Sequence, residues 1–265
     1  MNISFDFPLD IMAIKFVAIM MRIGAFTAAF SFFDNANIPA TYKTLFVIML
    51  SVCMVPLVPA SWANAAFVQD LDMFKLGLLL ASEAILGIGI GLVVSFVLEV
   101  FNYGGSVIDM DIGFNAAQEF DPASQDTRSV IAGFFSQAFV VLFLAEDCHH
   151  EVIKLAFSSF ETLGPGAFLM SSDIFESVVK MSSAIFTSGI QIALPTLGAM
   201  LIINIALGLL ARIGEDFPVL MISFPLKLAV GIVIIIAIFP TVTGFFRVLN
   251  GELIRWIGMF TGVYA

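Results

Sequence analysis

The run EDCHHE at residues 146–151 is the group of side chains in this sequence whose types and spacing most resemble a metal site. Glu146 and His149 are three residues apart, and Asp147 and His150 repeat that spacing, so each pair shares one face of a helix. Carboxylates and imidazoles at this spacing can bind a divalent ion. A metal site normally takes further ligands from other helices, and the sequence has no other histidine. We therefore expect local pairing rather than a bound metal, with a metal-dependent enzyme built on Glu146, His149 and His150 as an alternative.

Four carboxylates in or beside a long apolar segment form a second candidate: Glu83, Glu99, Asp109 and Asp111. Such groups carry protons or ions in secondary transporters. Glu83 and Glu99 are sixteen residues apart, which places them within about 80 degrees of each other on a helix. That acidic face indicates contact with water or with a cationic partner. A small-solute transporter is thus an alternative, but it predicts two matching halves, and we find no convincing internal repeat.

Motifs of catalysis are missing from the sequence. It contains no GxSxG, no HExxH, no P-loop and no evident Ser/His/Asp arrangement. We therefore expect a protein that is not an enzyme and has no cofactor.

Composition identifies the class of protein that must position these groups. The chain is 60% hydrophobic and 12% charged, with a mean hydropathy of +1.05, whereas soluble domains carry roughly a quarter charged residues. The apolar runs are continuous, unlike the alternating pattern of a β-barrel. A net charge of −10 argues against nucleic-acid binding. These features predict an all-α, polytopic membrane-type helical protein, although no interhelical segment is basic enough to indicate its orientation.

Two basic residues, Lys15 and Arg22, interrupt the first apolar run. They are seven residues apart and therefore fall on nearly the same face of a helix. We expect them to reach toward the membrane surface or to pair with a carboxylate, with contact to a partner protein or an aqueous space as the alternative. The residues that we expect to be buried polar groups or partner contacts are Lys15, Arg22, Glu83, Glu99, Gln191, Asn204 and Lys227.

Two features indicate close helix packing. Gly87, Gly89 and Gly91 allow a neighbouring backbone to approach the helix predicted over residues 71–103. Residues 181–211 carry no charge and would span about 46 Å as one helix, more than a hydrocarbon core of about 30 Å. Together with the apolar segment that follows, they predict one long helical hairpin over residues 172–262.

Residues 104–128 form the longest polar interval, with three glycines, a proline, five acids and one base. Asp121 and Pro122 resemble an N-cap followed by proline at the first helical position, which would restart a helix at a fixed point. This interval is too rich in polar and turn-forming residues for a simple connector, and we predict that it is the working part of the protein.

Four local patterns follow one another along residues 20–235. They are Arg22-Ile23-Gly24 before Asn37-Ile38-Pro39-Ala40; Gly105 before Gly113-Phe114 and Asp121-Pro122; Leu142-Phe143-Leu144 before His149, Ser159-Phe160 and Pro165-Gly166; and Ala193-Leu194-Pro195 before residues 207–212 and Phe224-Pro225-Leu226-Lys227. Because of the order and spacing of these patterns, the chain resembles the FliR/SctT family, the export-gate subunits of flagellar and injectisome type III secretion systems. It departs from the family at residues 215–218, where Glu-Asp replaces the usual Pro-Gln.

The resemblance implies an all-helical subunit of the bacterial inner membrane, within the flagellar basal body or a related secretion apparatus. It implies assembly with FliP-like and FliQ-like subunits, and with an FlhB-like subunit, around a channel for unfolded protein substrates. It also implies two regions, a FliP-like part at residues 1–170 and a FliQ-like hairpin at residues 171–265.

In the resembling proteins, the loop aligned with residues 114–127 projects into the channel and helps to keep it shut. We therefore define residues 113–122 as the gate loop. Phe114, Phe120 and the alanines would obstruct the channel by packing, and the polar side chains would bind neighbouring subunits. The residues of the gate loop are Gly113, Phe114, Asn115, Ala116, Ala117, Gln118, Glu119, Phe120, Asp121 and Pro122.

Overall fold

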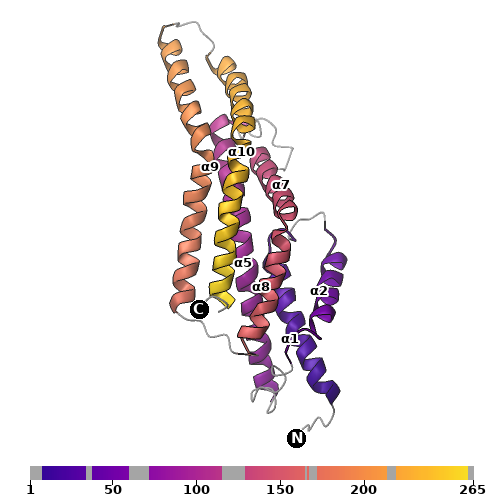
Figure 1. Cartoon of the computed structure of the whole chain (residues 1–265). Helices are drawn as coiled ribbons and strands as arrows, with labels where there is room; N and C mark the ends of the chain where they lie inside the picture. The colour runs from indigo at the N-terminus through magenta and orange to yellow at the C-terminus, as the bar shows by residue number, and fades with distance from the viewer. Residues whose placement is uncertain are drawn as a thin grey trace. The chain divides into compact units, whose positions relative to one another are not determined.

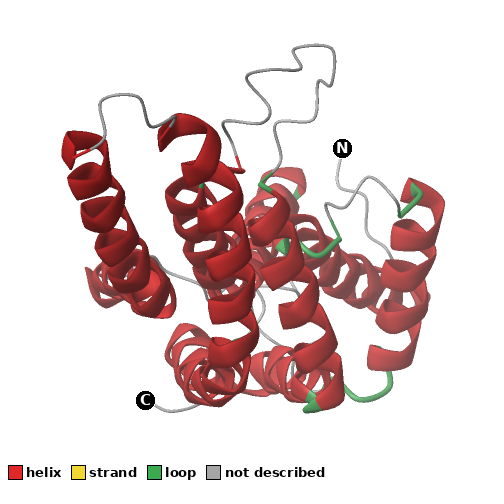
Figure 2. Ribbon diagram, turned by 90° about the horizontal axis from the view of Figure 1, so that it is seen from above, coloured by secondary structure: helices red, strands yellow, loops and turns green. Residues whose placement is uncertain are grey.

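The computed structural model describes residues 8–33, 38–59, 72–114, 129–164, 166, 172–213 and 219–261. All regular secondary structure in these residues is helical (Figure 2). Figure 1 labels the helices, which are α1 (Pro8–Ala29), α2 (Ala40–Met54), α5 (Met73–Ile112), α7 (Val130–Ala145), α8 (Cys148–Thr162), α9 (Ser172–Ile213) and α10 (Val219–Thr261). The predicted all-α fold is confirmed.

Several helices are long and apolar enough to cross a membrane. Four stretches meet this requirement by themselves: Met12–Ala29, Met73–Ile112, Val178–Arg212 and Met221–Met259. Helices α7 and α8 would add a fifth span if the two together formed one broken crossing. The predicted polytopic membrane class is therefore confirmed, and the two helices predicted for residues 172–262 are present as α9 and α10.

Helix α5 extends beyond the end that the sequence suggested. The polar interval was expected to begin at Gly104 as a loop, whereas α5 continues to Ile112. The reason is tertiary packing. A Cβ atom at Gly104 would lie 3.0 Å from the carbonyl oxygen of Gly189 on α9, and one at Gly105 would lie 2.5 Å from Cα of Ala132 on α7. Two neighbouring helices thus hold the glycine pair in helical conformation, against its low helix propensity.

The described residues fall into two compact units. Unit 1 is drawn from residues 1–96, 147–179 and 251–265, and unit 2 from residues 97–146 and 180–250. The boundary between the units lies within α5, after Phe96. The division into a FliP-like and a FliQ-like region at residue 170 concerns likeness to other proteins, and it stays a prediction.

In unit 1, α1 packs against α2 and α5. The core contains Ile19 and Ile23 of α1, Met54 of α2, Leu79 of α5 and Phe160 of α8. Lys15 connects α1 to the turn that follows α2, because its Nζ donates a 2.6 Å hydrogen bond to the carbonyl oxygen of Val58.

The face of α5 that meets α1 repeats every four residues. A side chain at Gly87 would overlap the carbonyl oxygen of Arg22. A Cβ atom at Gly91 would lie 2.6 Å from the carbonyl oxygen of Phe26. One turn further, the Ser95 hydroxyl donates a 2.8 Å hydrogen bond to the carbonyl oxygen of Ala29, where α1 ends. Because the residue numbers at these contacts increase in the same direction along both helices, α1 and α5 run parallel. The predicted role of Gly87 and Gly91 in close packing agrees with these contacts.

In unit 2, the second part of α5 packs against α7, α9 and α10. The rings of Phe101 on α5, Phe139 on α7 and Phe246 on α10 lie with centroids 5.3–6.1 Å apart. A Cβ atom at Gly231 of α10 would lie 3.2 Å from Cε of Met200 on α9. Met200 lies about as many residues before the end of α9 as Gly231 lies after the start of α10. Two antiparallel helices of a hairpin pair in this way.

Candidate functional site

A buried ion pair joins α1 to α5 in unit 1. The side chains of Arg22 and Glu83 are 2% and 0% exposed, and Nε of Arg22 donates a 2.6 Å hydrogen bond to Oε2 of Glu83. The Arg22 Nη2 atom lies 2.6 Å from the same oxygen. Arg22 and Glu83, which the sequence indicated as buried polar or partner contacts, therefore satisfy each other within the chain.

Helix α8 completes the surroundings of this pair. Nη1 of Arg22 donates a 2.8 Å hydrogen bond to the Ser159 hydroxyl, and the guanidinium carbon lies 3.9 Å from the ring centroid of Phe160. On the other side, the backbone N–H of Gly166 donates a 3.4 Å hydrogen bond to Oε1 of Glu83. Hydrogen bonds and a cation–π contact thus compensate two charges that would be costly to bury alone.

The other predicted polar contacts are more exposed. Glu99 is partly buried and accepts a 3.0 Å hydrogen bond from Nδ2 of Asn102 on its own helix. Gln191 and Asn204 are exposed on α9, and Lys227 of α10 is partly buried. The structure therefore does not bring the seven residues together in one site.

The start of the gate loop is described, and its anchors are packed firmly. Gly113 leaves α5 with φ +92°, a conformation that side chains disfavour, and its N–H bonds to the carbonyl oxygen of Asp109. Ser129 caps α7, because its hydroxyl accepts a 3.1 Å hydrogen bond from the N–H of Ala132. The contact of Gly105 with Ala132 brings the two helices to backbone distance, eight residues before Gly113 and three residues after Ser129.

Most of the gate loop lies outside the described residues. Gly113 and Phe114 are described and partly buried. The remaining predicted residues lie outside the described part of the chain: Asn115, Ala116, Ala117, Gln118, Glu119, Phe120, Asp121 and Pro122.

Two carboxylates stand on α5 just before the gate loop. Asp109 is fully buried, and neither of its side-chain oxygens has a hydrogen-bond partner among the described residues. Asp111 is partly buried. Two carboxyl groups therefore lie just before the gate loop in unit 2.

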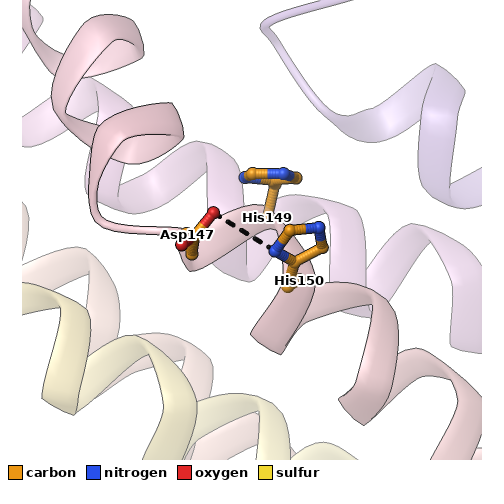
Figure 3. Close-up of side chains that lie close together, drawn as sticks. All are labelled: Asp147, His149 and His150. Atoms are coloured by element: carbon orange, nitrogen blue, oxygen red, sulfur yellow. Dashed lines mark ion pairs between the residues drawn. The ribbon is translucent and has the colours of Figure 1, made fainter.

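The run at residues 146–151 forms a short-range pair and also reaches a distant helix. Oδ1 of Asp147 lies 3.3 Å from Nδ1 of His150, as the spacing suggested (Figure 3). Glu146 pairs with Arg247 of α10, with Nη2 2.8 Å from its Oε1. The ring of His149 lies beside that of His150, with centroids 4.0 Å apart and ring planes tilted by 37°.

Sequence reasoning missed the partners that come from distant segments. Ser159 and Phe160 belong to a pattern of the family, but neither they nor Arg247 carry a local signal of these contacts, because they meet Arg22 and Glu146 only after the helices have packed. Ser95 is a polar residue in the apolar part of α5, eight residues after Gly87. Its position on the same helix face was the one available indication that it meets α1.

Comparison with known proteins identifies relatives along most of the chain. Residues 13–253 match the family described as "Bacterial export proteins, family 1". The "Flagellar biosynthetic protein FliR" of Escherichia coli K12 is 30% identical over 236 residues, which cover 88% of this chain and 87% of that protein.

Proteins of the same name in two other bacteria are also similar. The one from Buchnera aphidicola subsp. Schizaphis graminum is 26% identical over 252 residues, which cover 95% of each chain. The one from Bacillus subtilis 168 is 25% identical over 225 residues, which cover 83% of this chain and 84% of its own. This chain therefore belongs to family 1 of the bacterial export proteins, the family that contains FliR.

Proposed function

We propose that this chain helps to close a protein export channel with its gate loop, residues 113–122. The coarser function follows from the family: the protein is a subunit of the flagellar type III export apparatus in the bacterial inner membrane. The gate loop adds a specific role, in which residues between α5 and α7 obstruct the path of unfolded substrates.

The observation that supports this role is the way the chain is held at Gly113, where α5 ends, and at Ser129, where α7 begins. Gly105 contacts Ala132 at backbone distance, Gly113 ends α5 in a left-handed turn, and Ser129 caps α7. A loop between two fixed anchors can change its conformation while the helices stay in place. Opening the channel would then require movement of the loop alone.

We also propose that FliP-like and FliQ-like subunits, and an FlhB-like subunit, surround this chain. The apolar side chains that α9 and α10 leave exposed support this assembly. Ile202 on α9 is 69% exposed, and Val233 and Ile236 on α10 are 65% and 68% exposed. The apolar stretches of these helices are 35 and 39 residues long, well beyond the roughly 20 residues of a membrane span, so lipid alone would not cover them.

The transporter alternative loses one of its coupling groups. Glu83 is fully buried and paired with Arg22, so it is not available to carry an ion. The family supports the role of a structural and transport component of the export apparatus instead.

Shortening the gate loop tests the proposal. We would delete several residues between Phe114 and Asp121 and measure ion leakage across membranes that contain the assembled gate. The expected result is increased leakage, because a shorter loop no longer fills the channel. Replacing Phe114 and Phe120 with serine, without changing the length, should also increase leakage. Gly133→Ala on α7 is the control and should change leakage little, because it lies outside the loop and nothing lies within 4 Å of its added Cβ.

Copurification separates a failure of the gate from a failure of assembly. Each variant should still copurify with its partner subunits, because the anchors of the loop are unchanged. Unchanged leakage in a fully assembled deletion variant would contradict the closing role. A chain that never copurifies with FliP-like and FliQ-like subunits would contradict the proposed partners.

A further inference from the structure

Three possible metal ligands meet at the start of α8. The ligand atoms of Asp147, His149 and His150 all lie within 4.8 Å of one another. The carboxylate of Asp147 points toward His150, and the ring of His149 lies beside them (Figure 3). We propose that these three side chains form a binding site for a borderline divalent transition-metal ion, of which Zn²⁺ fits best.

The donor types select this class of ion. Two imidazole nitrogens and one carboxylate oxygen are ligands of Zn²⁺, and the nitrogen donors also suit Ni²⁺ and Cu²⁺. Mg²⁺ and Ca²⁺ prefer oxygen ligands throughout, and this cluster offers one carboxylate. Three protein ligands with water in a fourth position complete a tetrahedral zinc site.

The geometry needs only a small contraction. Ligand atoms about 2.0–2.2 Å from a tetrahedral zinc ion lie roughly 3.4 Å from one another. The Asp147–His150 contact, at 3.3 Å, already has that spacing. The side chains of Asp147 and His150 are 74% and 59% exposed, so they can rotate toward the third ligand without disturbing the packed core. Their exposure also gives water access to the open position.

The charges around the cluster leave Asp147 available. Glu146 is paired with Arg247, and Glu151 is paired with Lys154 at 2.7 Å. Asp147 forms no ion pair with a lysine or arginine in the part of the chain that the structure describes. Its negative charge is therefore not neutralised by a permanent cation, and a metal ion can compensate it.

One effect opposes the binding of a cation here. The cluster lies at the N-terminus of α8, where the helix dipole favours anions. At an exposed helix end this weakens the binding of a divalent cation by up to about thirtyfold. Loss of even an outer-shell partner of a metal ligand typically costs about 10–100-fold in affinity, so three direct ligands outweigh the dipole. The spacing of the ligands over four consecutive residues predicts a local site that clamps Asp147 onto the first turn of α8.

Zinc titration of the full-length protein tests the site. The purified chain would carry an affinity tag without histidine, be freed of metal, and be titrated in detergent with Zn²⁺ and separately with Mg²⁺. We expect one equivalent of Zn²⁺ to bind, with a rise in melting temperature, and Mg²⁺ to bind much more weakly. His149→Ala, His150→Ala and Asp147→Asn should each weaken Zn²⁺ binding about tenfold or more.

Matched variants in the same turn control the experiment. Glu151→Gln and Cys148→Ser should leave Zn²⁺ binding unchanged, because neither side chain belongs to the cluster. Co²⁺ should give visible absorption bands that are lost in His150→Ala, which reports directly on imidazole ligation. Unchanged Zn²⁺ affinity in His150→Ala, equal binding of Mg²⁺, or loss of binding in Cys148→Ser would each overturn the proposed ligand set.

Discussion

Two arginine–carboxylate pairs in this chain have the same chemistry and very different surroundings. The Arg22–Glu83 pair is buried, whereas the side chains of Arg247 and Glu146 are 72% and 38% exposed. Removing one partner of a buried pair leaves an uncompensated charge and costs about 3–5 kcal/mol. An exposed pair contributes less than about 1 kcal/mol. Burial, rather than the presence of an ion pair, therefore decides which pair holds the fold.

We predict that Arg22→Ala destabilises the protein far more than Arg247→Ala. The thermal midpoint of each purified variant in detergent measures the difference. Both variants lose one arginine and one ion pair, so each serves as the control for the other. Equal midpoints for the two variants would mean that Glu83 finds other compensation, and the account of the buried pair would be wrong.

A second prediction separates the charge of this pair from its packing. Replacing both partners with apolar residues, as in the double variant Arg22→Met with Glu83→Leu, should recover most of the stability that Arg22→Ala loses. The reason is that no charge then stays buried, and volume is largely kept. A double variant as unstable as Arg22→Ala would show that the contacts to Ser159 and Phe160 matter more than the charges.

At the scale of helices, glycine positions decide how closely α5 approaches its neighbours. We predict that Gly105→Ala destabilises the α5–α7 contact, because the new Cβ would lie 2.5 Å from a backbone atom of Ala132. Gly133→Ala on α7 is the matched control, since nothing lies within 4 Å of its added Cβ. That variant should be neutral or more stable by up to about 1 kcal/mol, the difference in helix propensity.

Because Gly105 joins the two helices that flank the gate loop, the same two variants also connect packing with closure. Gly105→Ala should increase ion leakage in an assembled gate, and Gly133→Ala should not. Equal thermal midpoints for the two variants would contradict the close contact. A destabilised Gly105→Ala variant with normal leakage would instead show that closure tolerates movement of the anchors.

Helices were predictable from the sequence wherever apolar runs ended in strong breaking signals. Pro39 directly precedes α2, and α8 ends at Thr162, just before Gly164. The end of α5 was not predictable, because Gly104 and Gly105 favour a turn locally and become helical only by packing against α7 and α9. For the same reason, a carboxylate partner was only one of the expectations for Arg22, and the choice of Glu83 required the alignment of α1 with α5. The gate loop, known from family resemblance, stays a prediction.

At the scale of the whole molecule, the exposed face of α10 contacts either lipid or a partner subunit, and substitutions on it can tell which. We predict that Val233→Trp and Ile236→Trp reduce copurification of partner subunits. A larger side chain overpacks a helix interface and costs about 1–3 kcal/mol, whereas fluid lipid chains yield to it. Because both residues are more than half exposed in the chain itself, the thermal midpoint of the isolated variants should not change. That midpoint is the control for folding. Normal copurification of both variants would place this face of α10 against lipid, and the assembly would then have to use other surfaces, such as the exposed side of α9.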